Sequence, residues 1–99
     1  MEKYQTIWGK RIKELLDEKG LTQKTLAEAI AIYNNETPRP TTISDWMNKG
    51  SKPNQKNIEA LAFILDVTPG YIMGDASKEE SDIIVNARKA MKEKLFKRL

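Results

Sequence analysis

The segment TTISDWMNKGSKP, residues 41–53, decides which fold this chain adopts. Within it, Ile43, Trp46 and Met47 stand at positions i, i+3 and i+4, which places three large apolar side chains on one face of a helix. Glycine and proline within residues 49–54 end the helical pattern. Because so short a helix is stable only when its apolar face packs against other elements, the segment predicts a packed helical domain.

Helical spacing of apolar residues continues on both sides of this segment, and no stretch alternates apolar and polar residues over the length of a strand. Capping signals mark the helix ends, namely threonine or asparagine before a helix, proline at its first position and glycine after it. These signals predict five short helices, at residues 4–19 (ended by Gly20), from Thr22 onward, at 41–48, at 54–65 (begun by Asn54) and at 68–73 (begun by Thr68-Pro69 and ended by Gly74).

The stretch AIYNNETPRP, residues 31–40, connects the second and third predicted helices and allows two conformations at each end. Either the stretch is an extended turn, or the second helix continues to Tyr33 before two asparagines stop it. The third helix begins either at the Thr-Pro pair 37–38 or at Pro40, and Pro40 disfavours the α conformation at Arg39, which supports the later start. In both cases the prolines stiffen the approach to the third helix and orient Arg39.

The last quarter of the chain differs in pattern. Residues 75–81 (DASKEES) predict a polar connector, and residues 82–99 resume helical spacing with a basic opposite face. We therefore expect one helical domain at 1–75 and, at 76–99, a connector followed by an amphipathic helix. Its apolar positions are Ile84, Ala87, Met91, Leu95 and Leu99.

The amphipathic tail allows three arrangements. It is a dimerisation helix that buries Ile84, Met91 and Leu95 against a second copy, or a helix that packs back on its own domain, or a basic arm that contacts DNA or a membrane. The first arrangement suits a protein that binds a palindromic site, because a two-fold dimer has the same symmetry as such a site.

The composition excludes several classes of function. The 99 residues contain neither cysteine nor histidine, which excludes disulfides, thiolate or imidazole metal sites and catalytic triads built on these side chains. Without a glycine-rich phosphate loop or clustered carboxylates, we expect no enzyme, no cofactor, no metal and no small-molecule substrate. No run approaches the roughly 20 apolar residues of a membrane span. The absence of cysteine suits the cytoplasm, and the net charge of +3 favours a polyanionic partner.

Four motifs in fixed order resemble one family. They are LTQKTLAEAI at 21–30, TTISDWMN at 41–48, the Lys-Pro pair at 52–53 and the Val-Thr-Pro to Met-Gly stretch within 58–75. Together they resemble the Cro/repressor-type helix-turn-helix domains of phages, the lambda-repressor-like or XRE-type family, over residues 5–75. The resemblance implies a five-helix DNA-binding domain whose third helix lies in the major groove. The stretch between the second and third helices is longer here than is usual in that family.

The resemblance also implies which residues would contact DNA. Short polar side chains on the outer face of the third helix suit base readout, while basic and polar residues near its ends suit phosphate. An acidic residue on this face either accepts from a cytosine amino group or serves the positive end of the helix dipole. The base-reading positions that the family implies are Pro40, Thr41, Thr42, Ser44, Asp45 and Asn48. The phosphate-binding positions are Gln23, Lys24, Arg39, Lys49, Ser51, Lys52 and Asn54.

The sequence therefore predicts an all-α protein with a lambda-repressor-like DNA-binding domain and a C-terminal amphipathic helix. Its expected function is that of a sequence-specific transcriptional regulator, a Cro-like repressor that binds a palindromic operator in double-stranded DNA as a homodimer. Two alternatives stay open. One is an antitoxin- or immunity-type regulator whose tail also binds a partner protein, and the other is an interaction module that has lost DNA binding.

Overall fold

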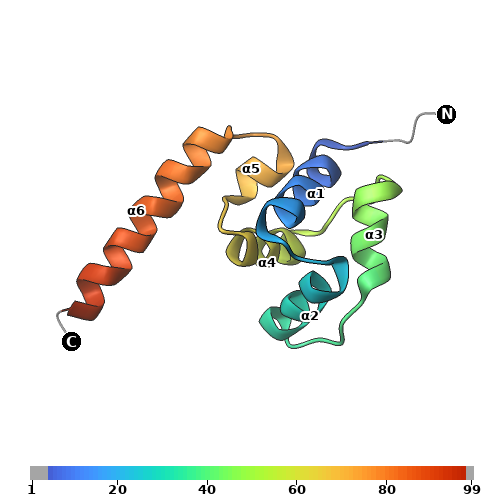
Figure 1. The fold of residues 1–99 in the computed structure, drawn as a ribbon, viewed down its shortest axis with the longest axis horizontal. Helices are drawn as coiled ribbons and strands as arrows, with labels where there is room; N and C mark the ends of the chain where they lie inside the picture. Colours follow the sequence, from blue (N-terminus) through green and yellow to red (C-terminus); the bar gives the residue numbers. More distant parts are fainter. Residues whose placement is uncertain (1–4, 98–99) are drawn as a thin grey trace.

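The computed structural model describes residues 5–97, which form helices joined by short loops, with no strand in that range. The helices are α1 (Ile7–Lys19), α2 (Gln23–Asn34), α3 (Pro40–Asn48), α4 (Gln55–Leu65), α5 (Pro69–Met73) and α6 (Lys78–Lys97). Helices α1 to α5 gather into one body, and α6 leaves this body as a straight rod (Figure 1). The all-helical class predicted from the sequence is confirmed.

Helices α1, α2, α4 and α5 each begin at a side chain that accepts a hydrogen bond from an otherwise free backbone N–H of the first turn. The pairs are Thr6 with Gly9, Thr22 with Thr25, Asn54 with Asn57 and Thr68 with Tyr71, at 2.9, 3.0, 2.9 and 3.2 Å. The caps predicted at Thr22, Asn54 and Thr68 are confirmed. The predicted start of the first helix at residue 4 was three residues too early, because the cap at Thr6 sets the beginning at Ile7; position 4 itself lies outside the described residues.

The stretch between α2 and α3 adopts one of the two conformations that the sequence allows at each end. Helix α2 continues to Asn34, and Asn35 ends it in the left-handed conformation (φ 55°, ψ 53°), which asparagine tolerates better than most residues. Helix α3 begins at Pro40, while Arg39 stays outside the helix (φ −135°, ψ 81°). The stretch is therefore a short loop after an α2 that continues to Asn34, and the Thr-Pro pair at 37–38 starts no helix.

Helix α6 begins earlier than predicted. The Glu80 N–H donates to the Ser77 hydroxyl at 3.1 Å, and this hydroxyl donates to Glu80 Oε1 at 3.3 Å, so Ser77 caps the start of the helix. The prediction of a polar connector up to residue 81 was wrong, because this cap starts the helix at Lys78. The Ser-x-x-Glu signature at 77–80 was readable in the sequence. Across residues 5–97, α6 included, no helix has both the length and the apolar character that crossing a bilayer requires.

The base of α6 is anchored to α5 and α1. Ser81 is fully buried, and its hydroxyl oxygen accepts from the Thr68 N–H at 3.0 Å. Arg11 of α1 donates to the carbonyl oxygens of Tyr71 and, at 3.1 Å, Ala76, and its guanidinium lies 4.3 Å from the centre of the Tyr71 ring. These contacts fix where α6 leaves the body. Further along α6, Lys89 Nζ lies 4.0 Å from Asp66 Oδ2 and Lys92 Nζ lies 5.8 Å from the centre of the Phe63 ring, but most side chains beyond Asp82 are exposed.

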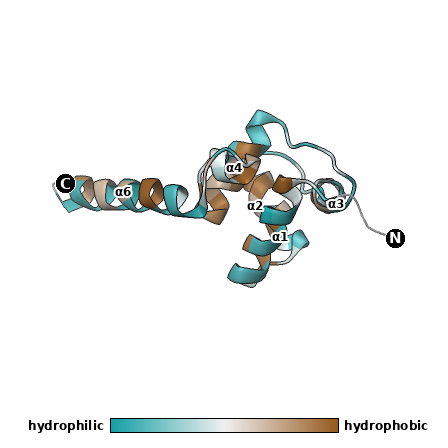
Figure 2. Cartoon of the chain, turned by 90° about the horizontal axis from the view of Figure 1, so that it is seen from above, coloured by the Kyte–Doolittle hydropathy of each residue, from teal (hydrophilic) through white to brown (hydrophobic). Residues whose placement is uncertain are grey.

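Helices α1 to α5 share one hydrophobic core. Helix α3 packs on α1 and α2, α2 packs on α4, and α5 packs on α1 and α4. Hydrophobic segments of the five helices meet inside the body, while the loop before α3 is hydrophilic (Figure 2). Trp46 is 4% exposed, which confirms its prediction as a core residue. The buried core residues are Ile12, Leu15, Leu16, Leu26, Ala27, Ile30, Ile43, Trp46, Ala60, Leu61, Ala62, Leu65, Val67 and Ile72.

Gly9 lets α1 and α3 approach closely. A Cβ atom at this position would lie 2.7 Å from the Trp46 carbonyl oxygen, 2.9 Å from the Thr6 hydroxyl and 3.2 Å from Met47 Cα. Two of these neighbours are backbone atoms of α3, which cannot move aside without displacing that helix.

Replacing Gly9 by alanine is therefore expected to lower the free energy of unfolding by roughly 1–3 kcal/mol, although alanine is the better helix former by about 1 kcal/mol at an ordinary helical site. Thermal unfolding followed by circular dichroism measures the change. Gly70→Ala is the matched control, since a Cβ there meets its nearest neighbour at an ordinary 3.5 Å. Equal melting temperatures for the two variants would contradict the close approach of α1 and α3.

Candidate nucleic-acid interface

The outer face of α3 is polar and accessible. Its inner residues Ile43 and Trp46 are buried against α1 and α2, which turns the opposite side of the helix toward solvent at the edge of the body (Figure 1). All six residues predicted to read bases lie on α3. Pro40, Thr41 and Asn48 are exposed, whereas Thr42, Ser44 and Asp45 are partly buried.

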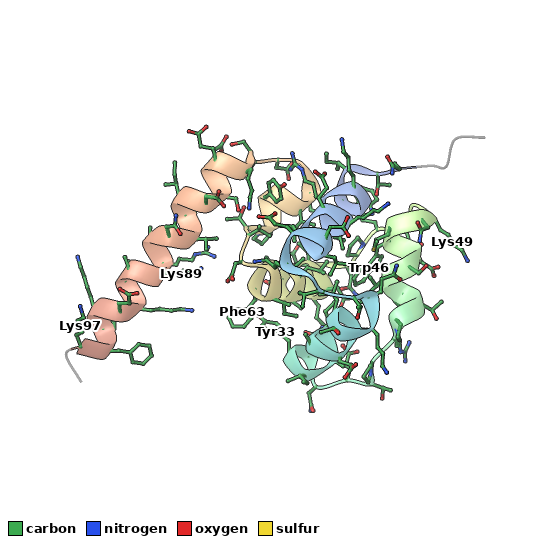
Figure 3. All side chains as sticks on the ribbon, in the orientation of Figure 1. Tyr33, Trp46, Lys49, Phe63, Lys89 and Lys97 are labelled. Carbon is green, nitrogen blue, oxygen red and sulfur yellow. The ribbon has the colours of Figure 1, made fainter. Side chains whose placement is uncertain are left out.

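Positively charged side chains stand at both ends of α3. Arg39 precedes the first helical residue and Lys49 follows the last, and both are exposed, as is Lys52 a few residues further on. Lys49 points outward from the end of α3, whereas Trp46 points into the body (Figure 3). A polar helical face with a cation at each end offers short polar side chains that suit base edges and positive charges that suit phosphates.

The acidic residue on this face has a basic neighbour. The Lys49 ammonium lies 3.6 Å from Asp45 Oδ1, one helical turn away, with the two side chains 74% and 33% exposed. Such an exposed pair adds little to folding stability. It does offset the negative charge of Asp45, which by itself would repel a phosphate backbone.

The other predicted phosphate-binding residues come from two neighbouring segments. Gln23, partly buried, and Lys24, exposed, open α2, which packs against α3. Ser51 and Asn54 are exposed in the loop between α3 and α4, but each also has a structural contact. The Ser51 carbonyl oxygen accepts from Trp8 Nε1 at 2.9 Å, and Asn54 Oδ1 caps α4.

The loop before α3 is tied to α4 by contacts that the sequence analysis missed. Glu36 Oε1 lies 2.9 Å from Lys56 Nζ, and Asn34 Nδ2 donates to Asn57 Oδ1 at 3.1 Å. Each pair joins residues about twenty positions apart in the chain, so no local pattern predicts them. Both pairs join the end of α2 and the following loop to the start of α4.

A hollow of about 240 Å³ brings three predicted site residues from different segments together. Arg39 of the loop, Thr42 of α3 and Asn54 before α4 all line it. These side chains offer hydrogen-bond donors that suit an anionic or polar group. The remaining lining residues are Ala27, Ile30, Ala31, Glu36, Thr37, Ile43, Trp46 and Asn57.

Comparison of the chain with protein-family models, with curated proteins and with solved structures gave no match. The arrangement of its own side chains therefore has to carry the functional assignment.

Proposed function

We propose that the protein is a sequence-specific DNA-binding transcriptional regulator, a Cro-like repressor of lambda-repressor-like architecture that acts by binding and not by catalysis. The observation that carries this proposal is the exposed polar face of α3 between Arg39 and Lys49. A helix designed only for packing would more often carry Lys and Glu on its exposed face, which have better helix propensity than Thr, Ser, Asp or Asn.

In the proposed complex α3 lies in the major groove. Thr41, Asp45 and Asn48 meet base edges, and Asp45 accepts from a cytosine amino group. Arg39 before α3, and Lys49 and Lys52 after it, neutralise phosphates on the two sides of the groove. The start of α2, with Gln23 and Lys24, would touch the same backbone, as the first helix of a helix-turn-helix does. Two copies would bind two half-sites of a palindrome.

Selection of bound sequences from random double-stranded DNA tests the proposal. A recurrent half-site should emerge, present twice in opposite orientations about one helical turn apart, or a multiple of this distance. The same protein should bind DNA upstream of its own gene in a salt-dependent manner. A selection that yields no preferred sequence, together with no salt-dependent binding to that DNA, would sink the proposal.

Thr41→Ala is expected to weaken binding to the selected site by roughly 5- to 150-fold, the equivalent of about 1–3 kcal/mol of base discrimination, and to relax the preference at one base pair. Binding to unrelated DNA should be unchanged, because the substitution removes no charge. Fluorescence anisotropy measures the affinity of each variant for the selected site and for unrelated DNA. Asn86→Ala on α6 is the control, and it should behave as the parent protein does.

A second candidate function is the regulator that also binds a partner protein. A groove of about 550 Å³ lies between α4 and α6. The rings of Tyr33 and Phe63 contact each other at the groove, with their centroids 5.2 Å apart. These two residues are 47% and 62% exposed. The basic side chains Arg88, Lys89 and Lys92 line its other wall. Aromatic rings opposite cations suit an acidic segment with apolar anchors.

The candidate is tested with the protein encoded next to this chain's gene, if its sequence carries such an acidic segment. Phe63→Ser should weaken that complex more than tenfold and leave DNA binding unchanged. Binding of the partner without any DNA binding would favour the interaction module over the regulator. Unchanged partner binding in Phe63→Ser would exclude the groove as the binding site for the partner.

A further inference from the structure

Helix α6 carries an apolar face that its own domain does not cover. Ile84, Met91 and Leu95 are 42%, 63% and 61% exposed, and Ala87 between them is also exposed. Their spacing of three to four residues places them in one stripe along the helix. Bands of hydrophobic residues follow α6 well away from the body (Figure 2). The opposite side, with Lys89, faces the groove beside α4 (Figure 3).

The charges of α6 are divided between its two ends. The first turn contains Glu79 and Glu80, whereas the last turn contains Lys94 and Lys97. The described second half adds further basic residues and a single acidic one, Glu93. Two such helices side by side in parallel would place acid beside acid and base beside base. In antiparallel orientation each acidic end meets a basic end.

We propose that two copies of this chain pair through α6 in antiparallel orientation. A pairing that sets Ile84 of one helix against Met91 of the other brings Glu80 level with Lys94 to within one residue. At about 100° per residue, Glu80 and Lys94 both lie on one flank of the stripe, about 30° and 70° from the direction of Ile84 and Met91. A two-fold axis across an antiparallel pair turns like flanks toward each other, so the apolar register and the charge register agree.

The size of the contact sets its strength. A helix of 20 residues is about 30 Å long, and one pair of such helices buries less than the roughly 1,200 Å² that marks stable complexes. We therefore expect a dissociation constant on the order of micromolar. The proposal deepens the dimeric part of the proposed function and rests on it only there; the pairing itself needs no DNA.

Cysteine cross-linking tests the orientation, since the chain has no cysteine of its own. A mixture of Ile84→Cys and Met91→Cys should form a disulfide-linked dimer under mild oxidation, and each variant alone should not. Within an antiparallel pair, identical positions lie about 10 Å apart along the axis, beyond the Cα separation of about 4.4–6.8 Å that a disulfide allows. A mixture of Asn86→Cys and Glu93→Cys, with the same spacing on another face, is the control for random collision.

Cross-linking of each variant with itself would show parallel pairing and overturn the proposal. No cross-link above the control in any combination would overturn pairing through this face altogether. Either result would leave the proposed DNA binding untouched, because that function is tested separately by selection from random DNA. Likewise, a failed selection would leave the pairing through α6 untouched, because the cross-linking is done without DNA.

Charge reversal tests the register independently. Glu80→Lys and Lys94→Glu should each raise the dissociation constant about tenfold in equilibrium sedimentation without DNA, because each creates two repulsive pairs per dimer. The double variant should recover the parent value to within about threefold. Glu93→Lys is the matched control and should change little. Single reversals without effect, or a double variant no better than the singles, would contradict the antiparallel register.

Discussion

Replacing Trp46 by alanine is expected to lower the free energy of unfolding by about 3–5 kcal/mol. Trp46 is 4% exposed, and its indole packs where α1, α2 and α3 meet. Its removal leaves a cavity that the backbone contact at Gly9 prevents α3 from closing. A domain of this size has a total stability of only about 5–15 kcal/mol, so the variant should lose roughly a fifth of it or more.

The expected signature is a melting temperature at least about 15 °C lower by circular dichroism. Phe63→Ala removes another aromatic ring, but one that is 62% exposed, and should cost no more than about 1 kcal/mol. Equal melting temperatures for the two variants would contradict the packing of α3 described above. Trp46 is buried and is not one of the proposed DNA contacts. DNA binding of Trp46→Ala should therefore fall only in proportion to the loss of folded protein.

Affinity for the selected operator is expected to fall on the order of 10⁴-fold between 50 and 200 mM salt. The four basic residues proposed to touch phosphate are Lys24, Arg39, Lys49 and Lys52. Two copies on a palindrome then neutralise about eight phosphates, which predicts a slope of about −7 for the logarithm of affinity against the logarithm of salt concentration. Anisotropy titrations at a series of salt concentrations measure this slope.

The same salt slope distinguishes a bound dimer from a bound monomer when one basic residue is replaced by a neutral one. Lys52→Gln should reduce the slope by about two units if a dimer binds and by about one if a monomer binds. Lys89→Gln on α6, whose side chain faces the groove beside α4, should leave the slope unchanged. A slope near zero for the parent protein would remove the electrostatic basis of the proposed function.

Features set by neighbouring residues were predictable from the sequence. The caps at Thr22, Asn54 and Thr68 depend on hydrogen bonds to a backbone N–H three residues away, and such bonds leave a local signature. The start of α3 at Pro40 followed from the rigidity of proline. The start of α6 was not predicted, although Ser77 stands three residues before Glu80, whose N–H it caps, because the composition of residues 75–81 is that of a polar connector.

Features that join distant residues were beyond the sequence. The bonds from Trp8 to the Ser51 carbonyl and from Arg11 to the Ala76 carbonyl span 43 and 65 positions. They depend on how the helices pack, and no short motif encodes that packing. The same holds for the hollow that joins Arg39, Thr42 and Asn54, since three separate segments supply its walls.

The narrow attachment of α6 makes this helix a lever. Ser81 and its bond from the Thr68 N–H form the pivot, and the part of α6 beyond it is about 24 Å long. A tilt of about 10° at the pivot would move the far end by roughly 4 Å, which is more than the 3.4 Å rise of one base pair. In a dimer joined through α6, small adjustments at Ser81 would therefore let the two α1–α5 bodies fit operators whose half-sites differ in separation by a base pair.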